Sequence, residues 1–514
     1  MRTVTEYLVA AAKRFPEKTA LADGKNKITW AAFAEYAGRI GLYLKKRGIE
    51  KQAVGVLAVR TANTPVLFMG TAWGGNFYVP LDPSLPQEKL EKIVHNSGMR
   101  IVLTEDKAIR DMQMFEEEGI VCVTLEEMLG AVSAEEAETA GYNAGMPAQI
   151  AEAEEDLPLY MVYTSGSTGI PKGVLKTHGA VIDFADCYAK TFGFDENEII
   201  GNQTPFFFDA SAKDLYLLLK TGASMEVIPT EMFSFPVKLI EYMNEKQVTF
   251  ISWVPSALAI ITQLNTFKDI LPTTLKKVFF VGEVFPMKQF NKWRAALPDL
   301  QYVNLYGSSE IAGICCYYDV PKDAVFAETQ ALPVGKALPN CRVFLVKDDQ
   351  VVTQENVPGE IYIESKALAA EYFGDAQKTA ASFLQRDFDG TGMKRCFKTG
   401  DMAHWDADGN LVFESRTDFQ IKHMGHRIEL GEIEAMALTL DEIARCGCVY
   451  DEKKRRIVLF AELCEGVSVT GRDIQNLLRG KLSDYMLPNR VNILEKMPLN
   501  ANGKIDRPKC KEML

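Results

Sequence analysis

The sequence predicts an α/β fold: a large N-terminal body of parallel-type sheets flanked by helices, a barrel-like segment, and a small mobile α+β C-terminal domain. Two observations support this prediction. Short apolar runs rich in Val, Ile and Phe alternate with segments of helical period through most of the N-terminal half, the pattern of proteins with parallel sheets. After Pro358, residues Gly, Asp and Thr punctuate shorter strands, which favours an antiparallel or barrel-like segment.

The expected elements follow in chain order. In the large body, strands are expected at 52–59, 100–104, 198–203 and 277–282, and a helix at 236–245. The acidic stretch 134–156 has no core pattern and is expected to be an exposed connection. Strands at 359–364 and 410–414 would close the body, and strands at 449–450 and 456–462 with a helix at 472–482 would form the small domain. We therefore expect domains at 1–417 and 418–514.

Composition restricts the function. The chain has 514 residues, of which 47% are hydrophobic and 25% charged, as in ordinary globular proteins. The net charge of −12 argues against nucleic acid as a partner, because affinity for phosphate backbones comes mostly from clustered Lys and Arg. Apolar stretches are too short for a membrane span, and the ten cysteines form no C-x-x-C pair. A cytoplasmic protein with reduced thiols and no membrane insertion is expected.

The sharpest local signal is a loop rich in Gly, Ser and Thr after a strand-like run at 157–162. It contains Thr164, Ser165, Gly166, Ser167, Thr168, Gly169 and Lys172. Glycines let backbone N–H groups turn toward one point, the hydroxyls add donors, and the lysine adds positive charge. The sequence therefore predicts a phosphate-binding loop, although the order of residues is not that of a Walker A motif.

Two weaker clusters each contain an acidic residue. Residues 304–310 include Asn304, Tyr306 and Glu310, an amide, an aromatic ring and a carboxylate that could read and stack a purine and hold Mg²⁺. Residues 398–401 end in Asp401, which in a tight turn could accept hydrogen bonds from ribose hydroxyls. Each cluster alone is compatible with a simple turn.

Further segments lie at 415–422, 425–434 and 502–507. Together with the three above, in this order, they resemble the adenylate-forming superfamily, and within it the amino-acid adenylation domains of nonribosomal peptide synthesis, including free-standing ones. D-alanine:carrier protein ligases are resembled around 280–284. The resemblance covers nearly the whole chain. Ser415, Ser308-Ser309 and 364–366 depart from the usual pattern.

The resemblance implies two half-reactions. A carboxylate first attacks the α-phosphorus of Mg²⁺·ATP and releases pyrophosphate; a thiol then displaces AMP. The cofactors would be ATP and Mg²⁺. Residues Thr164–Lys172 would hold the β- and γ-phosphates, Tyr306 and Phe413 would cover adenine near Asn304, and Asp401 would bind the ribose. Glu310, with Thr164, would bind Mg²⁺.

The resemblance also implies how the small domain acts. Lys504 would bridge the attacking carboxylate and the α-phosphate, and Arg416 would reach the ribose or phosphates. Asp418 would be the hinge between the domains. Positioning and charge neutralisation carry such transfers, so little covalent work falls to side chains.

The acid is expected to be an amino acid because of Asp209. In the resembling domains an aspartate here pairs with the substrate α-ammonium, and a buried lone carboxylate needs such a partner. Lys213, four residues on, could instead pair with Asp209 within the chain. The resemblance assigns the side-chain pocket to Ala210, Lys213, Ser252, Phe279, Val281, Leu305, Gly313 and Ile314. Lys213 could face the substrate or direct its charge to water, so the amino acid stays open.

The thiol is expected on a separate phosphopantetheinylated carrier protein, since no carrier segment follows residue 514. Three alternatives remain: a D-alanine:carrier protein ligase, an acyl-CoA ligase for a non-amino acid, and a nucleotide-binding regulator that has lost activity.

Overall fold

The computed structural model describes residues 2–106, 115, 118–143, 156–164, 171–327, 330–416, 420–499 and 505–514. The chain divides into two compact units. The first comprises Met1–Pro83, Val94–Val162 and Gly173–Ser415, and the second comprises Ser84–Ile93, Tyr163–Lys172 and Arg416–Leu514.

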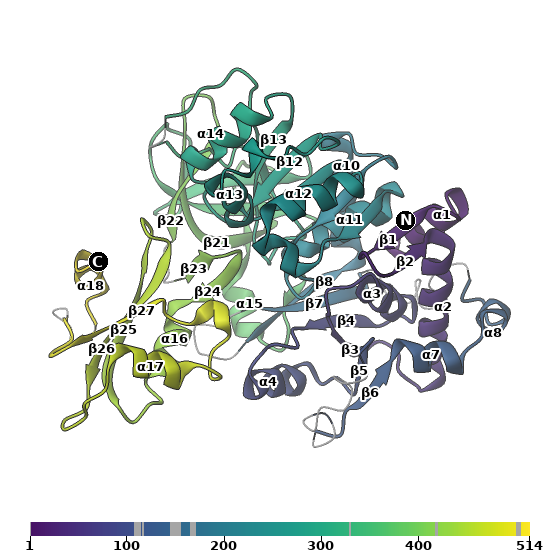
Figure 1. Ribbon diagram of the computed structural model, residues 1–514, viewed down its shortest axis with the longest axis horizontal. Coiled ribbons are helices and arrows are strands. Elements are labelled where there is room, and N and C mark those ends of the chain that lie inside the picture. The colour runs from purple at the N-terminus through teal and green to yellow at the C-terminus, as the bar shows by residue number, and fades with distance from the viewer. Residues whose placement is uncertain are drawn as a thin grey trace. The chain divides into compact units, whose positions relative to one another are not determined.

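Three sheets built from the described residues form the first unit (Figure 1). The largest runs in the order β15-β14-β13-β12-β11-β9-β10-β1-β2. Strands β1 and β9–β13 are parallel, and β2, β14 and β15 add antiparallel edges. The strands are β1 Thr19–Ala22, β2 Lys27–Thr29, β9 Ile199–Asn202, β10 Ser224–Val227, β11 Phe250–Trp253, β12 Lys277–Val281, β13 Gln301–Tyr306, β14 Cys316–Asp319 and β15 Lys336–Ala337.

The second sheet runs in the order β19-β8-β7-β4-β3-β5-β6, and β3 to β7 pair in parallel. Its strands are β3 Ala53–Leu57, β4 Phe77–Leu81, β5 Ile101–Thr104, β6 Val121–Thr124, β7 Pro158–Thr164, β8 Lys172–Thr177 and β19 Glu371–Tyr372. The third sheet is antiparallel, in the order β17-β16-β18-β21-β20 with β22 on β21. Its strands are β16 Cys341–Lys347, β17 Gln350–Val352, β18 Gly359–Ser365, β20 Phe383–Arg386, β21 Lys394–Trp405 and β22 Leu411–Arg416.

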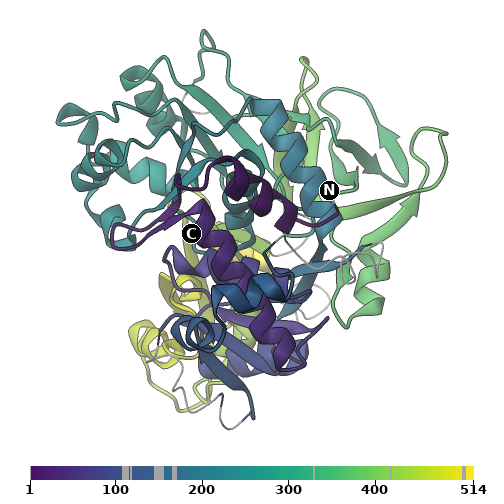
Figure 2. The ribbon, with the colours of Figure 1, turned by 90° about the vertical axis from the view of Figure 1, so that its right-hand side faces the viewer.

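Helices accompany the parallel strands, as the alternation in the sequence predicts. They are α1 Thr5–Arg14, α2 Trp30–Lys46, α3 Asn63–Trp73, α4 Gln87–Ser97, α7 Leu125–Ala131, α8 Ala134–Thr139, α10 His178–Phe192, α11 Ala212–Thr221, α12 Pro236–Glu245, α13 Pro255–Gln263, α14 Met287–Ala296 and α15 Ala376–Ser382, with short 3₁₀ turns η1 Asp209–Ser211, η2 Thr230–Ser234 and η3 Thr266–Lys268. Helices α2 and α3 lie side by side (Figures 1 and 2). They approach closely because Gly70 has no side chain: a Cβ there would lie 2.6 Å from Ile40.

The second unit has its own core around Ile433, Leu459 and Ile474. Strands β25 and β26 are antiparallel and β27 joins β26 in parallel, beside a small hairpin of β23 and β24. The elements are β23 Gln420–His423, β24 His426–Glu429, α16 Leu430–Ala437, β25 Ile443–Asp451, β26 Arg456–Leu463, α17 Gly471–Leu478, η4 Asp484–Met486, β27 Arg490–Leu494 and α18 Arg507–Glu512. The α+β character expected after residue 418 is thus observed, while Asp418 itself lies outside the described residues.

The expected strands and helices fall on strands and helices of the structure, although the strand expected at 449–450 is part of the longer β25 and the helix expected at 472–482 ends at Leu478. One expectation is wrong in part. The stretch 134–156 was expected to be an exposed connection, but it begins with α8. The Ser133 hydroxyl caps this helix, and Ala137 and Tyr142 are buried. A Cβ at Gly38 of α2 would lie 2.3 Å from the Tyr142 carbonyl. The segment is rich in glutamate, but its buried apolar residues Ala137 and Tyr142 are spaced so that the segment packs against α2.

Candidate active site

A contact between Tyr306 and Asp401 joins two segments that the sequence singled out for the nucleotide. Tyr306 ends the parallel strand β13, and ligands of open α/β sheets bind beyond such carboxyl ends. The Tyr306 hydroxyl donates a hydrogen bond to the Asp401 carboxylate across 95 positions of sequence. Both side chains are buried. Burial, and then the charge of Asp401, raise the pKa of Tyr306 well above its ordinary value, so the phenol stays protonated and holds the carboxylate.

Asp401 lies within a long strand rather than in the tight turn expected for it. Strand β21 bulges opposite β18, with the register shifting between Glu360 and Tyr362. Gly400 has φ +76°, which a residue with a side chain adopts only with strain. The Gly400 N–H donates to the Glu360 carboxylate at 2.9 Å, and the Asp401 N–H to the Thr399 hydroxyl at 3.0 Å. The bulge therefore fixes the direction of Asp401.

Two further predicted nucleotide residues lie in the first unit. The Asn304 amide, on β13, donates to the Pro333 carbonyl at 2.7 Å, which fixes the orientation of the amide. Phe413 lies on β22 and packs, partly buried, against the main core. Asn304 lies on the same strand as Tyr306, and Phe413 lies on β22, which pairs with the strand of Asp401.

The predicted magnesium residues are Glu310 and Thr164. Glu310 is fully buried and accepts a hydrogen bond from the Tyr372 hydroxyl at 2.9 Å. The Thr164 hydroxyl is buried and has no hydrogen-bond partner in the described part of the chain. In those residues no three Asp, Glu, His or Cys side chains gather as a metal site. Mg²⁺ usually keeps several waters and takes one or two protein ligands plus phosphates, so each of these side chains, taken by itself, is of a kind that suits it.

Several predicted residues cannot be assigned a geometry. Lys504, the hinge residue Asp418 and the loop residues Ser165, Gly166, Ser167, Thr168 and Gly169 lie outside the described residues. Thr164 ends β7, which agrees with the strand expected before the loop, and Lys172 begins β8, a strand that the sequence did not predict. Arg416 ends β22 and belongs to the second unit.

Asp209 has a partner that the sequence analysis did not identify. The Lys176 ammonium, on β8, lies 2.6 Å from Asp209 Oδ1. The Tyr160 hydroxyl, on β7, donates to the same oxygen at 2.9 Å. Burial raises the pKa of Asp209 and the nearby Lys176 opposes that shift. A signal was available in the sequence: β8 begins with Lys172, but Lys176 directly follows the apolar residues Val174 and Leu175, and a lysine in such a run usually has a buried partner.

Lys213 does not pair with Asp209, which the sequence analysis left possible. Its ammonium donates to Asp214 at 3.2 Å and to the carbonyls of Ala210 and Ser252 at 3.0 Å each. The side chain is 1% exposed. The Lys213 ammonium therefore faces neither the substrate nor water, the two orientations expected from the sequence, because its N–H groups donate to protein acceptors.

Four of the remaining pocket residues share one face of the largest sheet. Ser252 on β11 is directly opposite Phe279 on β12, and Val281 on β12 is opposite Leu305 on β13. Residues two apart on a strand, and those directly paired across strands, point to the same face. Gly313 has φ +69°, and a Cβ there would lie 2.1 Å from the Phe184 ring; Ile314 beside it is buried. The surroundings are apolar, as the sequence predicts.

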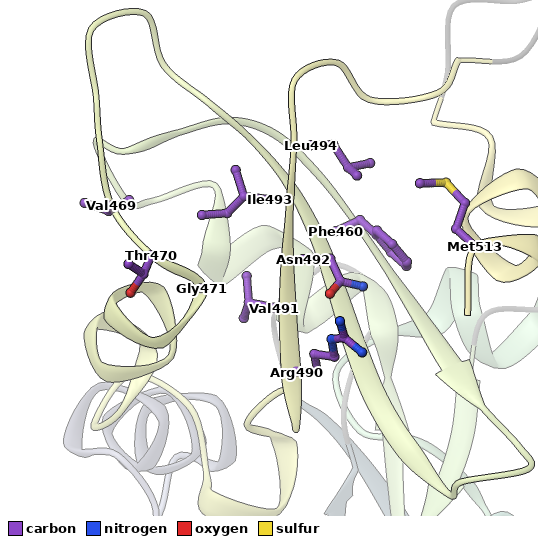
Figure 3. Close-up of a pocket in the computed structure, with 10 residues that line it drawn as sticks. All are labelled: Phe460, Val469, Thr470, Gly471, Arg490, Val491, Asn492, Ile493, Leu494 and Met513. Atoms are coloured by element: carbon purple, nitrogen blue, oxygen red, sulfur yellow. The ribbon is translucent and has the colours of Figure 1, made fainter.

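A separate groove of about 630 Å³ lies in the second unit between β27 and the start of α17 (Figure 3). Its lining includes Arg490, Asn492 and Met513; in Figure 3 Arg490 and Asn492 lie along β27, and Met513 lies beside the C-terminal helix. None of the predicted site residues lines it, so we assign it no part in the reaction.

The parallel sheets flanked by helices place this chain in the class of open α/β proteins, and the buried tyrosine–carboxylate contact lies at the carboxyl end of a strand, where such proteins bind ligands. Comparison with known families is more specific. The chain belongs to the AMP-binding enzyme family, which it matches over residues 8–373, and residues 432–504 match the AMP-binding enzyme C-terminal domain. This confirms the resemblance to the adenylate-forming superfamily.

Individual proteins agree with this assignment. Tyrocidine synthase 1 of Brevibacillus parabrevis is 27% identical over 98% of this chain, which spans 44% of that protein. Zwittermicin A synthase ZmaJ of Bacillus cereus is 29% identical, with 96% and 92% covered. PA1221, a nonribosomal peptide synthetase protein with adenylation and PCP domains, has the same fold, with a TM-score of 0.83 at 21% identity over 100% of this chain and 84% of that one.

Within the described residues, no helix has both the length and the apolar character needed to cross a bilayer.

Proposed function

We propose that this chain activates a carboxylic acid with ATP and passes the acyl group to the phosphopantetheine thiol of a separate carrier protein in the cytoplasm. A carboxylate oxygen attacks the α-phosphorus, the bond to the bridging oxygen breaks, and pyrophosphate leaves. A thiolate sulfur then attacks the acyl carbon, and AMP leaves with the electron pair. The observation that supports this most directly is the buried Tyr306–Asp401 contact, within a chain that belongs to the AMP-binding enzymes.

Each group of proposed site residues would bind a different part of Mg²⁺·ATP. Asp401 and Tyr306 would hold the ribose and adenine, and the residues from Thr164 to Lys172 would hold the β- and γ-phosphates. Mg²⁺, bound by Glu310 and the Thr164 hydroxyl, would neutralise phosphate charge. Lys504 and Arg416 would stabilise charge that develops at the α-phosphate, where preorganised donors are most effective.

Two classes of acid are candidates for this reaction. Asp209 and the peptide-synthetase relatives support the amino acids and their close analogues, and D-alanine:carrier protein ligase is one enzyme of this kind. The Lys176–Asp209 contact favours a second candidate within the same reaction, a carboxylic acid without a free ammonium group.

The carrier is proposed because PA1221 combines adenylation and PCP domains. ATP–pyrophosphate exchange over a panel of L- and D-amino acids, 2-hydroxy acids and simple carboxylic acids tests the first half-reaction. A mass shift of a phosphopantetheinylated carrier, compared with CoA as acceptor, tests the second. Exchange with no acid would contradict the proposal, and thioester formation on CoA alone would point to an acyl-CoA ligase.

A further inference from the structure

The Lys176 ammonium is fully committed to the protein. A lysine ammonium has three N–H donors. In this structure they end on Asp209 Oδ1 at 2.6 Å, the Tyr160 hydroxyl at 3.1 Å and the Ile311 carbonyl at 3.2 Å. The side chain is 0% exposed. Lys176 is thus a built-in cation of the candidate acid site, with no donor left for a ligand.

An aromatic stack holds this ion pair in place. The Tyr160 ring stacks on Tyr78 at 5.3 Å, and Tyr78 stacks on Phe68 at 4.2 Å. The hydroxyls of Tyr78 and Tyr216 are hydrogen-bonded at 2.7 Å. All four rings are buried. Because none of these groups reaches water, Lys176 has no solvated alternative to its place against Asp209.

The charge of Lys176 limits which ligands Asp209 can bind. Lys176 and Asp209 together are neutral, and the Asp209 side chain, 11% exposed, is the only one of the two with any accessible surface. A substrate ammonium at Asp209 would be a second cation on one carboxylate, and like charges repel strongly in a poorly solvated site. Glu310 is the further carboxylate that acts on both groups, but it is assigned to Mg²⁺, which would offset its charge.

We propose that Lys176 takes the place of the substrate α-ammonium at Asp209, and that the acid this chain activates has no charged α-amino group. The inference rests on the proposed adenylation reaction and specifies its substrate class: a 2-hydroxy acid, an unsubstituted acid, or an acid whose amine is acylated. The opposing view is that Lys176 merely orients Asp209, whose second oxygen still receives an ammonium.

The wild-type enzyme distinguishes the two views. ATP–pyrophosphate exchange is measured with sets of acids that share one carbon skeleton and carry ammonium, hydroxyl or hydrogen at the α-carbon. We expect kcat/KM for the hydroxy or unsubstituted member to exceed that of the amino acid by about 10–150-fold, the usual range for a charge-assisted contact. A preference of tenfold or more for the amino acids would overturn the inference and leave the proposed reaction intact. Absence of exchange with every acid would overturn both.

The variant Lys176→Met leaves Asp209 without its internal cation, so that the Asp209 carboxylate could pair with a substrate ammonium. The ratio of kcat/KM for amino acid over hydroxy acid should rise at least tenfold. A uniform loss with all acids would show that Lys176 is only structural. Lys277→Met is the control: Lys277, at the start of β12, also lies 2.6 Å from a carboxylate, but that of Glu198 rather than Asp209, and the ratio should not change.

A binding measurement keeps the test valid if Lys176→Met fails to fold. Non-hydrolysable acyl-adenylate analogues with and without the α-ammonium are titrated into the wild type and into Lys176→Met/Asp209→Asn, in which the ion pair is removed as a unit. Both proteins should bind the analogue without ammonium at least tenfold more tightly. Tighter binding of the ammonium-bearing analogue by the wild type would overturn the inference.

Discussion

Lys213 and Lys176 are both buried lysines, and the carboxylate with which each one pairs could not be predicted from the spacing of residues along the chain. Lys213 lies four residues after Asp209 but pairs with the adjacent Asp214, because η1 ends and α11 begins between them. Asp214 in turn accepts from the Asn202 amide at 3.0 Å. Lys176 reaches Asp209 from another strand. At the scale of the residue, tertiary packing selects the partner of each charge.

Removing Lys213 should destabilise the protein rather than change its preference among acids. Lys213→Met leaves Asp214, 1% exposed, without its cation, and breaking a buried pair costs roughly 3–5 kcal/mol. Urea unfolding measures this loss. The double variant Lys213→Met/Asp214→Asn, which removes both charges, should recover part of it. Unchanged stability with an altered acid profile would show that Lys213 faces the substrate.

His178 should make stability depend on pH. The Val4 N–H donates to His178 Nδ1 at 3.1 Å in a buried setting, and burial lowers the pKa of His178 to about 3. The unfolded chain, with a pKa of about 6.5, binds the proton first as the pH falls. This group therefore stabilises the fold above pH 6.5 or so and loses that contribution below it, by up to about 1.4 kcal/mol per pH unit.

The variant His178→Gln keeps an acceptor for Val4 but does not titrate. Urea unfolding between pH 7 and 5, a range of about two units around the unfolded pKa, should show a shallower pH dependence than in the parent. The exposed His95 supplies the control His95→Gln, whose pH dependence should match the parent. Equal slopes in parent and His178→Gln would contradict the assignment.

At the scale of the element, the bulge in β21 links a backbone angle to nucleotide binding. Gly400→Ala would place a side chain at φ +76°, a strain of about 1–2 kcal/mol, beside the carboxylate proposed to hold the ribose. We expect KM for ATP to rise about tenfold, as when roughly 1.4 kcal/mol of binding is lost. Gly390→Ala is a matched control because Gly390 has the same φ of +76° with open space around it. It should lose similar stability and keep its KM for ATP.

At the scale of the whole molecule, two half-reactions are proposed for one site. Lys504 belongs to the small domain and is proposed to meet charge developing at the α-phosphate. Lys504→Ala should lower acid-dependent pyrophosphate exchange by roughly 10²–10³, the usual cost of losing a preorganised donor. Loading of the carrier from preformed acyl-adenylate should persist. Equal loss in both assays, with circular dichroism unchanged, would refute a role confined to adenylation.

The proposed hinge offers a second test at this scale. Asp418→Pro restricts φ at one residue between the large and small domains, and mobile domains commonly gate chemistry. At least one half-reaction should slow, while binding of ATP, which needs mainly the large domain, should stay within about threefold, a difference of roughly 0.7 kcal/mol. Full activity in both half-reactions would mean that no rotation at 418 is needed.

The sequence by itself determined the α/β class, the family and many of the strands and helices, but not α8. Local periodicity decides whether a segment is a strand or a helix, which is why the helix 236–245 coincides with α12 and the strand 456–462 lies within β26. The glycine- and hydroxyl-rich loop and the segments around Tyr306 and Asp401 depend on short motifs, whose residues are adjacent in the chain.

Only the tertiary structure decided which distant groups meet. The Tyr306–Asp401 contact spans 95 positions, the strand bulge that directs Asp401 depends on pairing with β18, and Lys176, Tyr160 and Asp209 come from three elements. Such contacts depend on the order of strands in a sheet and on burial, which turns an unpaired charge into a large cost. No local pattern encodes that order, and so the charge balance of the acid site could be determined only from the folded chain.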